Sequence, residues 1–133
     1  PAGGSSQPAS ALTIESRQHF LKMNGKEIFK SAVRVMEKAT RELLSEHCLE
    51  INDVDHVIPH QANVRIVESM AQRLGIPMDK FFCNLDRHGN TSAASIPLAL
   101  DEAIRKGIFK EGELTVLVAF GAGLTWSATL VRF

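Results

Sequence analysis

The clearest pattern in the sequence is an apolar stripe between positions 26 and 48, where hydrophobic residues recur at steps of three and four. This spacing predicts an amphipathic helix that buries one face and exposes a charged face. The same spacing predicts a second helix over residues 64–74, ended by a glycine and a proline. A third helix is expected over residues 91–106. Because proline interrupts a helix beyond its first turn, Pro97 implies that this helix begins later or is kinked.

Apolar runs bounded by turn residues predict the strands of a sheet. They cover residues 18–23, 54–58, 81–85, 113–120 and 124–133. The alternation of strands and helices is typical of α/β proteins and predicts a mostly parallel, mixed sheet covered by helices. Only Gly121-Ala122-Gly123 separates the last two runs, so we expect them to form an antiparallel terminal pair.

The composition is that of a globular protein, because 44% of the 133 residues are hydrophobic and can bury a core. The formal net charge of zero gives no general electrostatic reason to expect nucleic acid as a partner. No apolar run approaches the roughly 20 residues that span a bilayer, so we expect no membrane partner and a cytoplasmic location. Residues 1–17 are interpreted as a loop or a connection between lobes, and residues 18–133 as a folded lobe.

The most informative chemical feature is a pair of polar segments, each at a place where a strand is expected to give way to a helix. His60 follows the run at 54–58, and open α/β sheets bind ligands at such carboxyl ends. Asn90, Thr91 and Ser92 precede the third helix and are candidates to cap it. A neutral imidazole and a side-chain amide can both donate hydrogen bonds to an oxygen that acquires charge, as in an enolate. A histidine at a strand end, taken alone, is more often structural.

The turn at Gly121-Ala122-Gly123 has two interpretations. Small residues permit a tight reversal between two strands, which is the simpler explanation. They also permit backbone amides to approach a substrate and form an oxyanion hole.

A basic stripe on the first helix also has two interpretations. Positive residues recur there every four positions, at Lys26, Lys30, Arg34 and Lys38. This pattern is typical of a solvated helix face, and it also suits docking of an acidic partner. Arg65 and Arg73 would add charge from the second helix.

Neither cysteine has a feature typical of a nucleophile. Cys48 ends the first predicted helix and Cys83 lies in an apolar run, so both are interpreted as packing residues. The five histidines show no spacing typical of a metal site, and we expect no metal.

Two long motifs carry a resemblance to a known family: residues 85–95, LDRHGNTSAAS, and residues 119–126, AFGAGLTW. The chain resembles the carboxyl-terminal half of β-ketoacyl-acyl-carrier-protein synthase III, a thiolase-fold condensing enzyme, over nearly its whole length. The resemblance implies a thiolase-like carboxyl-terminal lobe. It also implies decarboxylative Claisen condensation of an acyl-coenzyme A starter with malonyl-acyl-carrier protein, the step that initiates fatty-acid synthesis.

The resemblance implies roles for individual residues as well. His60 and Asn90 would be the second and third members of a Cys-His-Asn site and would stabilise the enolate. The residues implied to shape the acyl pocket and supply an oxyanion-hole amide are Phe120, Gly121, Ala122 and Gly123, with Ala122 standing where many relatives have glycine. The residues implied along a pantetheine tunnel are Gly25, Phe29, Ala62 and Asn63. Those implied at a carrier-protein docking surface are Lys30, Arg65 and Arg73.

The nucleophilic cysteine of this family lies in its amino-terminal half, and neither Cys48 nor Cys83 matches its position. We therefore expect a separate amino-terminal half, without which this chain would not catalyse the complete reaction. The other implied partners are acyl carrier protein and a second complete unit in a homodimer. No cofactor is expected to stay bound, since acyl-coenzyme A is a substrate and the carrier protein supplies phosphopantetheine. A polyketide-type condensing enzyme and a non-catalytic carrier-protein-binding lobe remain as alternatives.

Overall fold

The computed structural model describes residues 2–133. Its helices and strands follow the order α1 (Ala11–Glu15), α2 (Gly25–Glu46), β1 (His56–Pro59), α3 (Val64–Leu74), α4 (Leu85–His88), α5 (Ser95–Arg105), β2 (Leu114–Gly121) and β3 (Thr125–Arg132). Short 3₁₀ turns lie at Ile51–Asp53, Met78–Lys80 and Ser92–Ala94. Among the helices of this described part, none has both the length and the apolar character needed to cross a bilayer.

The three strands form a mixed sheet in the order β1-β2-β3. β1 runs parallel to β2, with His56 opposite Thr115 and Pro59 opposite Val118. β2 and β3 pair antiparallel along their whole length and are joined by residues 122–124. The expected mixed sheet with an antiparallel terminal pair is therefore confirmed.

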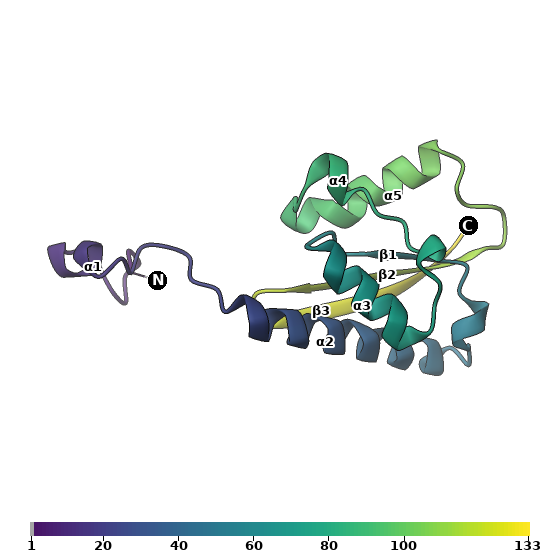
Figure 1. The fold of residues 1–133 in the computed structure, drawn as a ribbon, viewed down its shortest axis with the longest axis horizontal. Helices are drawn as coiled ribbons and strands as arrows, with labels where there is room; N and C mark the ends of the chain where they lie inside the picture. Colours follow the sequence, from purple (N-terminus) through teal and green to yellow (C-terminus); the bar gives the residue numbers. More distant parts are fainter. Residues whose placement is uncertain (1) are drawn as a thin grey trace.

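Helices cover both sides of this sheet, as Figure 1 shows. α2 and α3 pack against each other on one side, where α2 contacts β2 and β3. α4 and α5 lie on the other side, where α5 contacts β1. The carboxyl end of β1 therefore lies between the two helical layers, near the beginning of α5.

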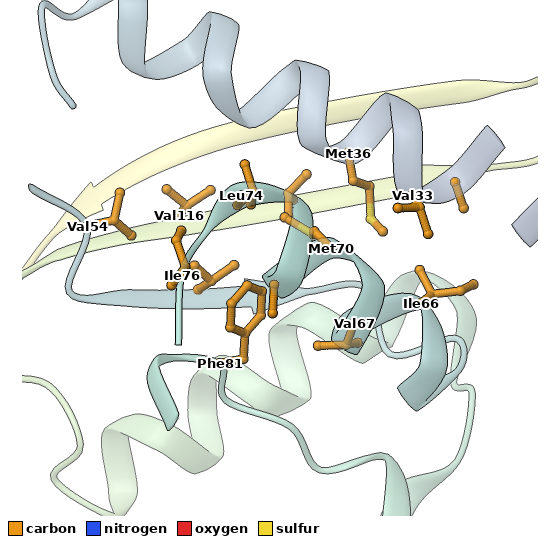
Figure 2. Packing of buried hydrophobic residues seen from close by; sticks show 14 of the residues in the cluster. Val33, Met36, Val54, Ile66, Val67, Met70, Leu74, Ile76, Phe81 and Val116 are labelled. Atoms are coloured by element: carbon orange, nitrogen blue, oxygen red, sulfur yellow. The ribbon is translucent and has the colours of Figure 1, made fainter. Parts of the chain in front are cut away.

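The main hydrophobic core lies between α2, α3 and the sheet (Figure 2). Met36 of α2, Met70 of α3 and Val116 of β2 have no exposed surface. Removing apolar surface from water contributes roughly 25 cal/mol per Å² to folding, so burial of this cluster stabilises the packing of α2 and α3 on the sheet. The apolar stripe of α2 faces this core, as its periodicity predicted.

The ends of α2 and α3 lie within two residues of the predicted ends, because local capping groups fix them. The side chain of Asn24 accepts a hydrogen bond from the backbone N–H of Glu27 at the beginning of α2. Asn63 does the same for Arg65 at the beginning of α3. α3 ends at Leu74 and is followed by Gly75, whose φ of 74° is a left-handed conformation that favours glycine.

The predicted strand at residues 18–23 is wrong. These residues form turns and irregular backbone and belong to no strand of the sheet. The apolar side chains of this segment do not pack into the core, since Leu21 is 92% exposed and Phe20 is 59% exposed. The segment before them also contains α1, which extends away from the sheet (Figure 1), while Pro1 lies outside the described residues. The division between residues 17 and 18 stays a prediction.

The predicted strand at residues 81–85 is also wrong. Phe81 forms a single bridge to Val57, and the backbone N–H of Phe82 donates to the carbonyl of Val57 at 3.0 Å. The carbonyl of Asn84 then accepts from two N–H groups of the following residues, which starts α4. These helical hydrogen bonds end the extended backbone after one bridge.

α5 begins at Ser95, after the 3₁₀ turn at Ser92–Ala94. Pro97 therefore lies in the first turn, where N–H groups have no acceptor within the helix. The later start is confirmed as the way in which this helix accommodates its proline. The residue before α5 is Ala94, so the prediction that a polar side chain at 90–92 caps this helix is wrong.

Candidate active site

His60 directly follows β1, and the sheet fixes its backbone. Its N–H donates to the carbonyl of Val118 at 2.8 Å, which extends the parallel pairing one residue beyond Pro59. The next backbone turns sharply, because the N–H of Ala62 donates to the carbonyl of His60 at 3.0 Å. The imidazole thus projects from the carboxyl end of the strand.

The imidazole of His60 has a buried partner in Ser95. Its Nδ1 lies 2.6 Å from the hydroxyl oxygen of Ser95, which also accepts from the N–H of Gln61 at 3.3 Å. The Ser95 side chain is buried, so its hydroxyl proton requires an acceptor, and Nδ1 of His60 is in place to accept it. We assign the neutral tautomer in which Nδ1 accepts and Nε2 carries the proton.

Burial favours the neutral form of this histidine. Removal of the ring from water lowers the pKa of His60 below its usual range. The imidazole therefore stays uncharged to a lower pH than a solvated histidine does. A neutral ring with a proton on Nε2 can donate a hydrogen bond to an oxygen without first losing a charge.

Asn90 lies between α4 and the 3₁₀ turn that leads into α5. Its side-chain oxygen accepts a hydrogen bond from the N–H of Ser92 at 3.0 Å. This bond fixes the orientation of the amide and leaves the side-chain nitrogen to donate elsewhere. Asn90 is exposed in this structure, so a bound molecule could reach that nitrogen.

Two cavities meet at His60 and Asn90. One has a volume of about 490 Å³ and is also lined by the beginning of α5 and by β3. The other has a volume of about 650 Å³ and is also lined by the beginnings of α2 and α3. The residues that line both cavities are His60, Asn90, Phe120, Gly121 and Ala122. A molecule in either cavity would therefore reach the same two hydrogen-bond donors.

The four residues expected along a pantetheine tunnel all line the larger cavity: Gly25, Phe29, Ala62 and Asn63. They come from the beginning of α2 and from the segment between β1 and α3. The apolar part of the lining includes Ile66 and Leu124. The structure thus brings these residues to one cavity with His60, while their role in binding stays a prediction.

The end of β2 and the first residue of the turn after it line both cavities. The ring of Phe120 meets the ring of His60 edge to face, with centroids 5.7 Å apart. Gly121 and Ala122 line both cavities, whereas Gly123 lines neither. Gly123 has a local structural role, because a Cβ there would lie 2.9 Å from the Thr125 side chain and its φ is 148°.

The basic residues expected at a docking surface differ in their partners. Lys30 pairs with Glu27 at 3.3 Å, and Arg73 pairs with Glu37 at 2.6 Å. Within residues 2–133, no ion pair involves Arg65, which is exposed in the first turn of α3. Arg65 and Arg73 stand about 12 Å apart along the axis of α3, at 1.5 Å per residue.

The cysteines do not join this site. Cys83 is partly buried, and that burial raises the pKa of its thiol, which disfavours the reactive thiolate. Cys48 is exposed after the end of α2, so its interpretation as a packing residue is wrong. Among residues 2–133 there is also no group of three His, Cys, Asp or Glu side chains arranged to hold a metal ion.

Sequence reasoning missed the role of Ser95. The residue was part of a recognised motif, yet its partner His60 lies 35 positions away in the sequence. No local pattern indicates this pairing, because it depends on α5 crossing the end of β1.

Known proteins resemble this chain along its whole length. Residues 44–133 match the family described as 3-oxoacyl-(acyl-carrier-protein) synthase III, C terminal. A curated β-ketoacyl-(acyl-carrier-protein) synthase III from Caldanaerobacter subterraneus subsp. tengcongensis is 52% identical, over 100% of this chain and 40% of that protein. The chain therefore spans well under half the length of the curated relatives it matches.

Solved structures show the same similarity. The crystal structure of 3-oxoacyl-(acyl-carrier-protein) synthase III from Aquifex aeolicus is 51% identical, with a TM-score of 0.83 over 86% of this chain and 37% of that one. A priming β-ketosynthase from the R1128 polyketide biosynthetic pathway is 36% identical, with a TM-score of 0.74 over 93% of this chain and 39% of that one.

Proposed function

Because the chain belongs to the 3-oxoacyl-(acyl-carrier-protein) synthase III family and has the thiolase-like fold of its carboxyl-terminal lobe, we propose that it supplies two of the three catalytic groups of a condensing enzyme. The reaction is the decarboxylative condensation of an acyl-coenzyme A starter with malonyl-acyl-carrier protein, which initiates fatty-acid synthesis. The observation that carries this proposal is the meeting of two cavities at His60 and Asn90.

The chemical role of this pair is to stabilise an enolate. When the malonyl thioester loses carbon dioxide, the electron pair of the broken carbon–carbon bond moves onto the thioester oxygen. Nε2 of His60 and the side-chain nitrogen of Asn90 then donate hydrogen bonds to that oxygen. Both donors are neutral and fixed by Ser95 and by the backbone of Ser92, so they need little reorganisation as charge develops.

The condensation step uses a cysteine from the remainder of the protein, outside residues 1–133. Its thiolate attacks the thioester carbonyl of acyl-coenzyme A and forms an acyl-cysteine thioester, while coenzyme A leaves as a thiolate. The enolate carbon then attacks the acyl carbonyl, and the cysteine thiolate leaves. Backbone amides beside Phe120 at Gly121 and Ala122 would donate to the developing oxyanion of the acyl group.

The larger cavity fits the phosphopantetheine arm of the carrier protein. Its residues Gly25, Phe29, Ala62 and Asn63 combine apolar walls with a polar group near the end of β1. No permanently bound cofactor is needed, since both thioesters enter as substrates. We further propose a cytoplasmic enzyme that acts as a homodimer of complete units.

The test of this function is an experiment with the complete protein, incubated first with acetyl-coenzyme A and then with malonyl-acyl-carrier protein. Intact-mass analysis should find one acetyl group, on a cysteine outside residues 1–133. Addition of the malonyl substrate should release carbon dioxide and yield a 3-ketoacyl-carrier protein. An acetyl group on Cys48 or Cys83, or a protein that stays unmodified and yields no product, would count against the proposal and favour a carrier-protein-binding lobe.

A polyketide-type condensing enzyme is the second candidate, because the priming β-ketosynthase of the R1128 pathway has the same fold at 36% identity. The two candidates share the decarboxylation and differ in the starter thioester. Competition between acetyl-coenzyme A and longer acyl-coenzyme A starters would separate them, since the preferred starter appears directly as the mass of the adduct.

Arg65→Glu should weaken use of the carrier protein more than use of coenzyme A. Arg65 is exposed and lies two residues beyond Asn63, at the larger cavity, so it is placed to meet an acidic partner. We expect KM for malonyl-acyl-carrier protein to rise about tenfold or more at low salt, with a smaller effect at high salt. The rate of acylation by acetyl-coenzyme A should change little.

Lys110→Glu is the matched control, because it reverses an exposed charge on the segment between α5 and β2. KM of this variant for malonyl-acyl-carrier protein should equal that of the protein without substitutions. Equal losses with carrier protein and with coenzyme A in the Arg65 variant would defeat the docking assignment.

A further inference from the structure

Three buried polar side chains surround the end of β1: Gln61 and Asn84 are 1% exposed, and Ser95 is 2% exposed. Buried polar groups require hydrogen-bond partners, and here the partners belong to three different segments. Ser95 connects α5 to His60, as described above. The two amides connect the remaining segments.

The amide of Gln61 joins the end of β1 to the segment before α4. Its nitrogen donates to the carbonyl of Pro59 at 2.7 Å and to that of Phe82 at 3.4 Å. Its oxygen accepts from the backbone N–H of Asn84 at 3.2 Å. One side chain, adjacent to His60, thus fixes the backbone that leads toward Asn90.

The side chain of Asn84 continues this connection to α5. Its nitrogen donates to a carboxylate oxygen of Glu102 at 3.0 Å. Glu102 also binds Arg87 of α4 and accepts from Lys106 at 2.6 Å. Bonds from Lys106 and Asn84 lower the pKa of Glu102 to about 2, so this acceptor stays charged at neutral pH. The result is an attachment of α4, and hence of the segment before Asn90, to α5.

We propose that Gln61 and Asn84 are positioning residues, whose buried amides hold the segments carrying His60 and Asn90 at the relative placement that enolate stabilisation requires. The role deepens the proposed function and rests on it. Neither residue lines the two cavities, so neither touches a substrate there. Both act by fixing the backbone next to His60 and the backbone of the segment before Asn90. A displacement of about 1 Å of a catalytic group reduces rates by up to about 100-fold.

Asn84→Asp is the sharpest variant, because it keeps the size of the side chain and removes the donor to Glu102. Two acceptors then face each other. In the complete protein we expect kcat for malonyl decarboxylation to fall about 10- to 100-fold, with a smaller change in KM for the malonyl thioester. The double variant Asn84→Asp with Glu102→Gln restores a donor and an acceptor with their roles exchanged, and it should recover much of the lost kcat.

Gln61→Met is the second variant, since methionine fills a similar volume without hydrogen bonds. Its matched control is Gln72→Met, which changes an exposed glutamine on α3 and should leave kcat unaffected. Thermal melting identifies any variant that does not fold. If Gln61→Met unfolds, the exchange between Asn84 and Glu102 still decides the question.

A readout without turnover separates this inference from the proposed function. NMR signals of the His60 ring and the Asn90 side-chain amide should shift in Asn84→Asp and return toward their original positions in the double variant. If the complete protein without any substitution releases no carbon dioxide, the proposed function is overturned. The NMR shifts of the variants would still test the positioning role. Folded variants with unchanged His60 and Asn90 signals, or with kcat equal to that of the unmodified protein, would overturn the positioning role.

Discussion

Replacing His60 or Asn90 by alanine is expected to reduce malonyl decarboxylation by the complete protein about 100- to 1,000-fold, the usual cost of removing one oxyanion donor. Each variant would remove one of the two proposed hydrogen bonds to the enolate oxygen. The effect should appear mainly in kcat, because the enolate carries more negative charge on that oxygen than the bound thioester does. Carbon dioxide release from a malonyl thioester, measured apart from condensation, isolates this step.

Two controls test whether the loss comes from chemistry. His47→Ala and Asn52→Ala change the same residue types at exposed positions outside both cavities and should keep full activity. The His60 variant should also keep its fold, because the ring is only partly buried and its backbone bond to Val118 remains. Near-normal decarboxylation in both active-site variants would exclude this mechanism.

Replacing Met36 by alanine is expected to lower the free energy of unfolding by about 2–5 kcal/mol. Met36 has no exposed surface and belongs to the cluster in which α2 meets α3 and the sheet (Figure 2). Alanine removes its buried apolar atoms and leaves a cavity that the surrounding helices and strands fill only in part. Because a domain is stable by only about 5–15 kcal/mol, this is a large fraction of its stability. Equilibrium denaturation measures the change.

Lys38→Ala is the companion variant, two residues farther along the same helix and on its exposed face. Its side chain pairs with Glu42 at 3.5 Å while remaining 64% exposed, and such pairs contribute about 0–1 kcal/mol. A loss in the Met36 variant no greater than in the Lys38 variant would mean that α2 is not held by its apolar stripe.

Helices α2 and α3 could be predicted from sequence because repeated packing contacts leave a repeated pattern. Each turn places one or two apolar residues on the buried side, and asparagines at 24 and 63 mark the beginnings. The two terminal strands were predictable for a different reason. The connection between them is only three residues long, which permits little besides antiparallel pairing.

The incorrect strand predictions have a shared cause. Residues 18–23 and 81–85 contain enough apolar residues to suggest strands, but a strand also needs a neighbour with free backbone groups. The first segment has none in the sheet, and the second leaves Val57 after one bridge because α4 begins. Composition within a short window carries no information about either circumstance.

The candidate site also has a part that could be predicted from the sequence and a part that could not. His60 and Asn90 were predictable as candidates because their residue types and local positions suit charge stabilisation, and their resemblance to a family strengthened that interpretation. The contacts of Ser95, Gln61 and Asn84 were not predictable, because they join residues 18 to 35 positions apart. Such bonds arise only when α4 and α5 are folded across the end of β1.

The proline in the first turn of α5 has a thermodynamic consequence for His60. Pro97 stands two residues after Ser95, in the first turn of α5, where a backbone N–H would have no acceptor within the helix. Its ring fixes φ in the unfolded chain as well as in the folded protein. The unfolded ensemble has fewer conformations to lose there, so the turn that holds Ser95 is ordered at a smaller entropic cost. Ser95 lies in that turn, and its hydrogen bond to Nδ1 of His60 restricts the orientation of the imidazole. His60 would therefore be oriented when the protein folds, and a thioester that arrives later would meet a donor whose freedom has already been lost.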